Sequence, residues 1–147
     1  MNYEDVVSRL APCGLNCGRC ADYQNGEIRE LSLRLVQLLG DYGRVAKIKA
    51  DRMPAFQNYA QFDEILRPFS RGGCGGCRSD NPNSPIECKA ATCHKEKRVD
   101  FCFQCSEYPC DNPTLGSLIK RWKKRNDRMK EIGVMEFYRE QEKLPRY

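Results

Sequence analysis

The chain has 147 residues, of which 40% are hydrophobic and 31% charged, with a formal net charge of +5. This composition is typical of a water-soluble globular protein and argues against a disordered or membrane-spanning chain. The most apolar stretch, residues 31–39, contains Ser32, Arg34 and Gln37 and falls short of the roughly 18–20 apolar residues of a bilayer span. Acidic residues follow Met1 where a secretory signal carries basic ones, so we expect one cytoplasmic domain, residues 1–147, without membrane contact.

Residues 1–12 are predicted to be an N-terminal lead-in that starts with a short amphipathic helix over residues 1–10. The next helix begins after Asn25, a suitable N-cap, and Gly40 or Gly43 can end it in a left-handed conformation. Its apolar stripe consists of Ile28, Leu31, Leu35, Leu38 and Leu39.

A second helix is predicted to begin at Pro54, because proline is well suited to the first helical position. Pro68 should stop this helix nearby. The apolar residues that recur at helical spacing are Ala55, Tyr59, Phe62, Leu66 and Phe69. We expect these two helices to pack a modest core.

Residues 69–112 contain few large apolar side chains apart from cysteine and many Gly, Pro, Asn and Ser residues. Such a segment buries too little apolar surface to offset an ordering entropy of about 1–2 kcal/mol per residue for the backbone. A structural zinc ion can supply about 10–16 kcal/mol per site. Residues 13–112, with the two helices, are therefore predicted to be a cysteine-rich metal-binding part.

Residues 113–147 are predicted to be a C-terminal helical tail, which starts at Asn112–Pro113 and is interrupted at Gly133 before a last helix over residues 134–144. The apolar face of its first helix consists of Leu115, Leu118, Ile119, Trp122, Met129 and Ile132. The predicted fold class is mainly α, with irregular, metal-stapled cysteine-rich segments and little β structure beyond short hairpins at the cysteine knuckles.

Ten cysteines in a reducing compartment favour metal ligation over disulfides, and their short spacings beside glycine and charged residues argue against inert burial. The predicted metal ligands are Cys13, Cys17, Cys20, Cys74, Cys77, Cys88, Cys93, Cys102, Cys105 and Cys110. Zinc is the expected ion. Because a divalent ion on four thiolates carries −2, two such sites would lower the net charge from +5 to about +1.

Cys74-Gly-Gly-Cys77 is the strongest motif, because two thiolates separated by two residues can bind one tetrahedral ion through a tight turn. Cys102 and Cys105 have the same spacing. A redox dithiol would require a thioredoxin-like strand–helix setting, which the pattern does not show.

Two pairings of these ligands remain open. The slightly preferred site joins Cys74 and Cys77 to Cys88 and Cys93, and the rival joins them to Cys102 and Cys105, since loop entropy separates the two by well under about 1 kcal/mol. Under the preferred pairing, a second site takes four of the six remaining cysteines, from Cys13, Cys17, Cys20, Cys102, Cys105 and Cys110.

Two other metal chemistries fit less well. The C-x3-C-x2-C spacing at residues 13–20 also occurs in radical enzymes that bind an iron–sulfur cluster, but the chain is too short for their barrel. His94 is the single histidine, which excludes a three-histidine zinc centre. We expect His94 to be a surface residue on a helix rather than a ligand.

The cysteine motifs resemble those of small prokaryotic proteins classified as domain of unknown function 3795. The similar stretches are residues 11–17 with Cys20, 74–78, Cys88 with Cys93, 101–105, 108–110 and the tail around 132–134. This resemblance implies a metal-binding domain, with zinc presumed, and implies no reaction.

Three functions are compatible with these observations. The first is a structural zinc-binding module for interaction or regulation, with a protein as partner, and the second is a redox protein with a [4Fe–4S] cluster. The third is a nucleic-acid-binding module that uses the basic helix 120–130 and Trp122, although a solvated helix face with Trp122 in the core is favoured. No catalytic motif supports an enzyme.

Overall fold

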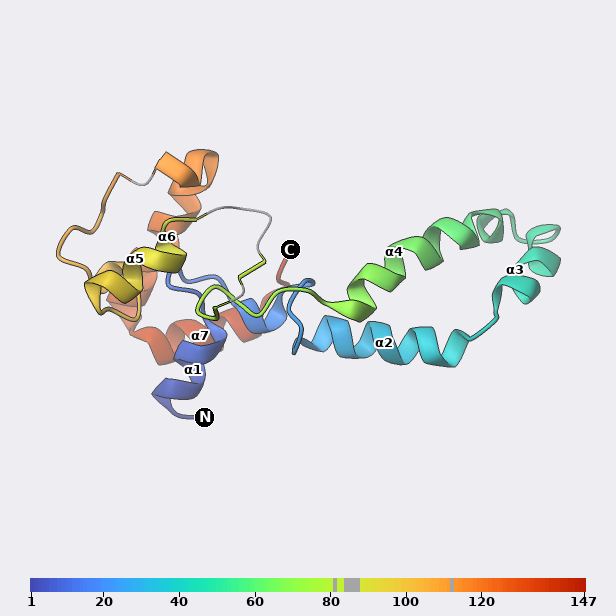
Figure 1. The fold of residues 1–147 in the computed structure, drawn as a ribbon, viewed down its shortest axis with the longest axis horizontal. Helices are drawn as coiled ribbons and strands as arrows, with labels where there is room; N and C mark the ends of the chain where they lie inside the picture. Colours follow the sequence, from blue (N-terminus) through green and yellow to red (C-terminus); the bar gives the residue numbers. More distant parts are fainter. Residues whose placement is uncertain (81, 84–87, 112) are drawn as a thin grey trace.

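The computed structural model describes residues 1–80, 82–83, 88–111 and 113–147, with only the backbone at 113–115. A helical arm extends from a compact body that contains both chain ends (Figure 1). The described residues form no sheet, and their only strand-like pairings are single bridges between Leu10 and Asn16 and between Tyr23 and Cys74. The prediction of a mainly helical, cysteine-rich fold is confirmed.

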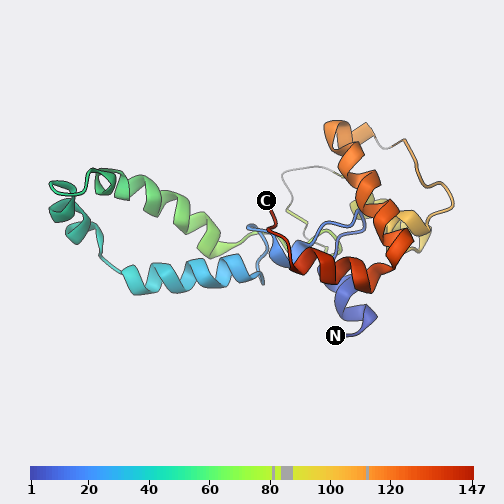
Figure 2. The ribbon, with the colours of Figure 1, turned by 180° about the vertical axis from the view of Figure 1, so that it is seen from behind.

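The arm is a pair of antiparallel helices joined at the tip by shorter ones, and the pair is visible from both sides (Figures 1 and 2). Its elements are α2 (Glu27–Leu39), α3 (Gly43–Ala50), the 3₁₀ helix η2 (Pro54–Asn58) and α4 (Tyr59–Arg71). The start at Pro54 is confirmed, but α3 was not expected from the sequence, because its eight residues carry no long apolar stripe.

Two predicted helix boundaries in the arm are wrong. The N-cap of α2 is Gly26 rather than Asn25. The C-cap is Gly40, one of the two predicted glycines, but its φ of 50° and ψ of −122° are not the left-handed conformation that was expected. Helix α4 continues past Pro68 to Arg71 and ends at Gly72, where φ is 60°. A proline removes one N–H donor, and the remaining hydrogen bond from Gly72 N to Pro68 O closes the last turn.

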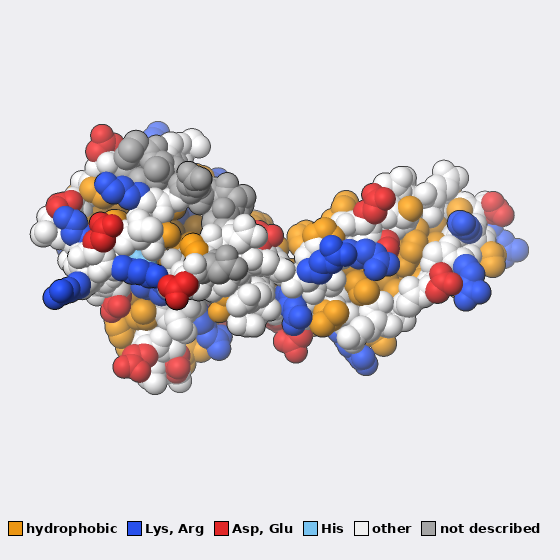
Figure 3. All heavy atoms as spheres, in the orientation of Figure 1, with side chains coloured by type: hydrophobic (Ala, Val, Ile, Leu, Met, Phe, Trp, Pro, Cys, Tyr) orange, Lys and Arg blue, Asp and Glu red, His pale blue; other side chains and the backbone are white. Residues whose placement is uncertain are grey.

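The arm has a thin interior. Helices α2 and α4 pack along each other, and between them Leu66 is the one large apolar side chain that is buried, beside Ser32 and Ser70. The α2 stripe faces outward instead, with Leu31 62% and Leu38 67% exposed. Hydrophobic atoms accordingly lie open along the arm surface (Figure 3). The two helices meet as predicted, but their core is smaller than expected.

The body has its main core between the two ends of the chain. Helices α1 (Tyr3–Arg9), α6 (Ile119–Ile132) and α7 (Val134–Glu142) contribute most of its apolar side chains, and Leu10 after α1 and Phe101 before the last cysteine knuckle add the others. The buried members of this core are Val6, Leu10, Phe101, Met129, Val134, Phe137 and Tyr138. The predicted helical lead-in and the predicted break at Gly133, where φ is 81°, are confirmed.

A second apolar cluster lies beside this core and contains Ala11, Cys13, Ala90 and Trp122. Helix α5 (Ala90–Lys97) supplies Ala90. A helix was expected at His94, but its bounds could not be predicted, since it is short and rich in charge. The knuckles at Cys17–Arg19 (η1) and Cys102–Gln104 (η3) are 3₁₀ turns, so they do not form the hairpins that the sequence allowed. The tail begins with the 3₁₀ segment η4 (Pro113–Leu118), while the predicted N-cap Asn112 lies outside the described residues.

Asn126 connects the cysteine segments to α6. Its side chain is fully buried, accepts from the N–H of Phe103 at 3.0 Å and donates to the carbonyl of Cys13 at 3.2 Å. One side chain thereby fixes the first and last cysteine segments against the same helix turn. None of the helices in the described part of the chain has the length and apolar content of a membrane span.

Candidate metal centres

Four cysteines line a cavity of about 210 Å³ at the junction of body and arm, and we call them the neck set: Cys17, Cys20, Cys74 and Cys77. Two come from the N-terminal loop and two from the segment that follows α4. Each pair has two intervening residues, so two knuckles face one another. The sequence did not reveal this combination.

Backbone hydrogen bonds position the neck set. The N–H of Gln24 donates to the carbonyl of Cys74 at 3.0 Å, and the N–H groups of Gly73 and Cys74 both donate to the backbone carbonyl of Asp22 at 2.9 Å. Within the second knuckle the N–H of Gly76, whose φ of 93° favours glycine, donates to Cys74 Sγ at 3.4 Å. The two knuckles are therefore joined by main chain next to the sulfurs.

The neck set lies in an electropositive setting. The thiol and backbone N–H of Cys77 bind the Cys17 sulfur and, with Arg146 and Arg78 nearby, lower the pKa of Cys17 to about 6 despite its burial. The same contact raises the pKa of Cys77. Arg146 Nε is buried and makes no hydrogen bond. Such an environment stabilises negative charge on sulfur.

The last residues of the chain lie beside the neck set. The hydroxyl of Tyr147 donates to Cys20 Sγ at 3.6 Å and accepts from the N–H of Ala21 at 3.0 Å. Arg19 holds this segment in place by donating to the carbonyls of Gln141 and Leu144. The C-terminus accordingly lies at the junction of body and arm in both ribbon views (Figure 2).

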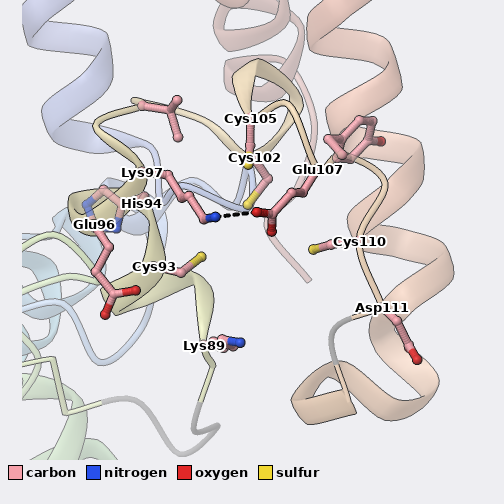
Figure 4. Close-up of a pocket in the computed structure, with 12 residues that line it drawn as sticks. Lys89, Cys93, His94, Glu96, Lys97, Cys102, Cys105, Glu107, Cys110 and Asp111 are labelled. Atoms are coloured by element: carbon pink, nitrogen blue, oxygen red, sulfur yellow. Dashed lines mark hydrogen bonds and ion pairs between the residues drawn. The ribbon is translucent and has the colours of Figure 1, made fainter.

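A second group of four cysteines lines a larger cavity of about 460 Å³, and we call it the distal set: Cys93, Cys102, Cys105 and Cys110. Cys93 projects from α5, and Cys102 and Cys105 flank η3 (Figure 4). Cys110 is exposed on the segment after η3. An ion pair between Lys97 and Glu107 joins α5 to that segment in the same view.

The electrostatics of the distal set differ from those of the neck set. Burial raises the pKa of Cys93, and the neighbouring Cys110 and Cys105 raise it further. Burial likewise raises the pKa of Cys102 to about 12, an effect that the indole N–H of Trp122 opposes. Trp122 Nε1 is buried without a hydrogen-bond acceptor of regular geometry.

Cys13 and Cys88 belong to neither set. Cys13 is 6% exposed, and burial raises its pKa, to which Cys88 contributes as a neighbour. Cys13 belongs to the apolar cluster around Ala90 and Trp122, and the half-buried Cys88 packs against it. The surroundings of Cys13 are those of a buried small hydrophobic residue.

The structure groups the cysteines differently from both pairings that the sequence left open. Cys74 and Cys77 lie with Cys17 and Cys20, whereas Cys93 lies with Cys102, Cys105 and Cys110. The cause is the bridge between Tyr23 and Cys74, which holds the two knuckles of the neck set together. Helix α5 meanwhile directs Cys93 toward η3.

His94 is buried rather than on the surface as expected, with 7% of its area exposed. Its Nδ1 pairs with the carbonyl of Ala90 at 2.8 Å, and burial lowers its pKa. The ring borders the distal cavity but lies away from the sulfur of Cys93 (Figure 4). This placement makes His94 part of the packing of α5.

The basic helix 120–130 has a mixed surface. Trp122 is 1% exposed, which confirms the interpretation that it belongs to the core. Lys123 pairs with Asp127 at 2.5 Å, and Arg128 pairs with Glu140 at 2.5 Å and Glu131 at 2.9 Å. The aromatic residue that would stack on a base is therefore not available.

No three Cys, His, Asp or Glu side chains among the described residues form a group arranged to hold an ion. Each set instead surrounds a cavity, so ligation would require its sulfurs to move inward to the Zn–S distance of about 2.3 Å. The donor chemistry fits, because each set offers four sulfurs with a buried side-chain N–H nearby, Arg146 Nε at the neck set and Trp122 Nε1 beside Cys102 at the distal set. These donors, Arg146 and Trp122, gave no signal in the sequence beyond their residue type.

Comparison with known proteins gives a family and no activity. No curated protein and no solved structure matches the chain detectably. Residues 9–114, which include all ten cysteines, match the family described as protein of unknown function (DUF3795). The match ends before the tail around residues 132–134, whose likeness to the family it does not cover. Because this match spans most of the sequence, the chain belongs to that family.

Proposed function

We propose that the protein is a zinc-binding module in which the neck set holds a structural zinc ion. The observation that carries this proposal is the meeting of two two-residue knuckles, Cys17–Cys20 and Cys74–Cys77, around one cavity. Four thiolates on a tetrahedral ion make a closed site that needs no further ligand.

The surroundings of the neck set support this proposal. A zinc ion on four thiolates carries a net charge of −2, which Arg146 and Arg78 beside Cys17 would offset. The N–H of Gly76 and the hydroxyl of Tyr147 already donate to two of the sulfurs. Such donors stabilise thiolate ligands and orient them.

The ion would act as a clamp between the body and the arm. It would tie the N-terminal loop to the segment after α4, and the chain offers few apolar side chains there to do so. A structural, interaction or regulatory role follows from such a clamp, and we assign no reaction to it.

The test is metal and sulfide analysis of protein purified anaerobically without chelator. We expect colourless protein that contains zinc, whereas four thiolates on an iron–sulfur cluster would give brown protein with iron and sulfide. Cys74→Ser should lose the zinc of the neck set, and Cys88→Ser, the matched control in the apolar cluster, should keep it. Well-ordered protein free of both metals would disprove the proposal.

A further inference from the structure

We infer that the distal set is a second, independent metal site, whose ion exchanges with solution faster than the ion of the neck set. This inference rests on the proposed zinc function and assigns a different behaviour to each set. The inference assigns eight of the ten cysteines as ligands, four to each ion, and leaves Cys13 and Cys88 unligated.

The two sets are separate in the fold. They share no residue, and the apolar cluster with Cys13 and Trp122 adjoins both, because Cys17, Cys77 and Cys102 pack against it. A shared ion would have to sit in this packed apolar region. Two separate ions satisfy the geometry without disturbing it.

A buried donor next to the distal set points to a bound thiolate there. Trp122 is 1% exposed, and its Nε1–H lies beside the sulfur of Cys102, whose pKa it lowers, with no other acceptor among the described residues. A buried indole N–H usually has an acceptor, because leaving it unsatisfied costs about 1–3 kcal/mol. The sulfur of Cys102 is its neighbour, and an ion on Cys102 would keep that sulfur an anionic acceptor.

One thiol of the distal set lies open to solvent. The volume of the distal cavity is about 460 Å³ against about 210 Å³ at the neck set, and Cys110 is exposed whereas Cys74 is buried. The wall is closed by the Lys97–Glu107 ion pair, whose side chains are 42% and 61% exposed (Figure 4). An exposed pair of this kind holds a segment only weakly.

The experiment follows zinc release into an excess of a chromogenic chelator, starting from protein loaded with two zinc equivalents. We expect two phases of one equivalent each, with a change in Trp122 emission during the fast phase. Cys105→Ser should abolish the fast phase and keep the slow one. Cys88→Ser is the matched control and should keep both. Glu107→Gln should speed the fast phase by about 1.5- to 5-fold, the range for an exposed ion pair, and leave the slow phase unchanged.

A single slow phase of one equivalent would overturn the inference and leave the proposed zinc at the neck set standing. The inference would also be overturned if Cys105→Ser released the same two phases as the unmodified chain. Failure of the proposed function gives a different result, namely no slow phase and no loss of zinc in Cys74→Ser.

Discussion

The body and the arm of this protein are held together in different ways. The arm, residues 27–71, contains no cysteine and buries one large apolar side chain, Leu66, between α2 and α4. The body contains all ten cysteines and buries Trp122, Phe101 and Phe137 among others. Contacts within the arm join elements of one continuous stretch of chain, chiefly α2 and α4, whereas contacts in the body join the first residues of the chain to the last.

This difference means that a perturbation can be assigned to one region. Trp122 is the single tryptophan and lies in the body, so its emission reports on the body alone. Peptides from α2 and α4 report on the arm in hydrogen-exchange measurements. The following four experiments test this difference between the regions, in order of decreasing expected effect.

Removing the metal should produce the largest effect, and should produce it in the body. Loss of zinc from thiolate sites removes several kcal/mol or more of folding free energy, given about 10–16 kcal/mol for one structural site. With a chelator, we expect Trp122 emission to shift to the red and α6 to lose exchange protection before α2 and α4. Simultaneous loss in both regions would show that body and arm unfold as one cooperative unit.

Shortening the buried side chain of Leu66 in the arm should give the next largest effect. Leu66→Ala removes a side chain that is 6% exposed and should cost about 2–5 kcal/mol, the range for buried leucines. Exchange protection in α2 and α4 should fall while zinc content stays the same. Ile65→Ala is the control on the same helix, since Ile65 is 61% exposed and should change protection little. A loss of zinc in Leu66→Ala would contradict the separation of the two regions.

A pair of glycine substitutions compares a crowded position in the body with an open one in the arm. Gly14 and Gly40 both have positive φ, 81° and 50°, so the backbone at either position is strained with alanine whatever the space around it. At Gly14 the new Cβ would also lie 2.8 Å from Met129 Cε, which adds about 1–3 kcal/mol of overpacking. At Gly40 nothing lies within 4 Å.

We therefore expect Gly14→Ala to lower the urea midpoint of the helical circular dichroism, which reports on both regions, clearly more than Gly40→Ala does. Equal shifts from the two variants would mean that Met129 moves aside without cost.

The smallest effect is expected on the outer face of the arm. Leu38 is 67% exposed, so Leu38→Lys should change the free energy of unfolding by no more than about 0.5 kcal/mol at any protein concentration. Thermal unfolding over a range of concentrations measures this. A larger, concentration-dependent loss would show that this face is covered by a second molecule.

Helices in which apolar residues recur over a long stretch could be predicted from the sequence, whereas short helices could not. Helices near residues 27–39 and 119–142 follow from stripes such as Leu31, Leu35 and Leu38, but a stripe does not tell which surface it meets. Here Leu38 faces solvent, and Ser32 lies against the neighbouring helix. Helices α3 and α5, of eight residues each, have no stripe long enough to detect.

The cysteines could be predicted as a group of candidate ligands, but not their partners. Loop entropy alone hardly distinguishes one pairing from another, because it grows only slowly with loop length. The grouping is set by the backbone bridge between Tyr23 and Cys74 and by the direction of α5, neither of which leaves a local pattern in the sequence.

The narrow connection at Tyr23 and Cys74 also forms a pivot between the arm and the body. Two short lengths of chain join the arm to the body there, and the cysteines of the neck set flank both. Because the tip at α3 lies far from this pivot (Figure 1), a slight rotation at the pivot swings the tip through a long arc. A change in how tightly the sulfurs of the neck set are held would thus alter the angle between the arm and the body, and the tip of the arm would move the furthest.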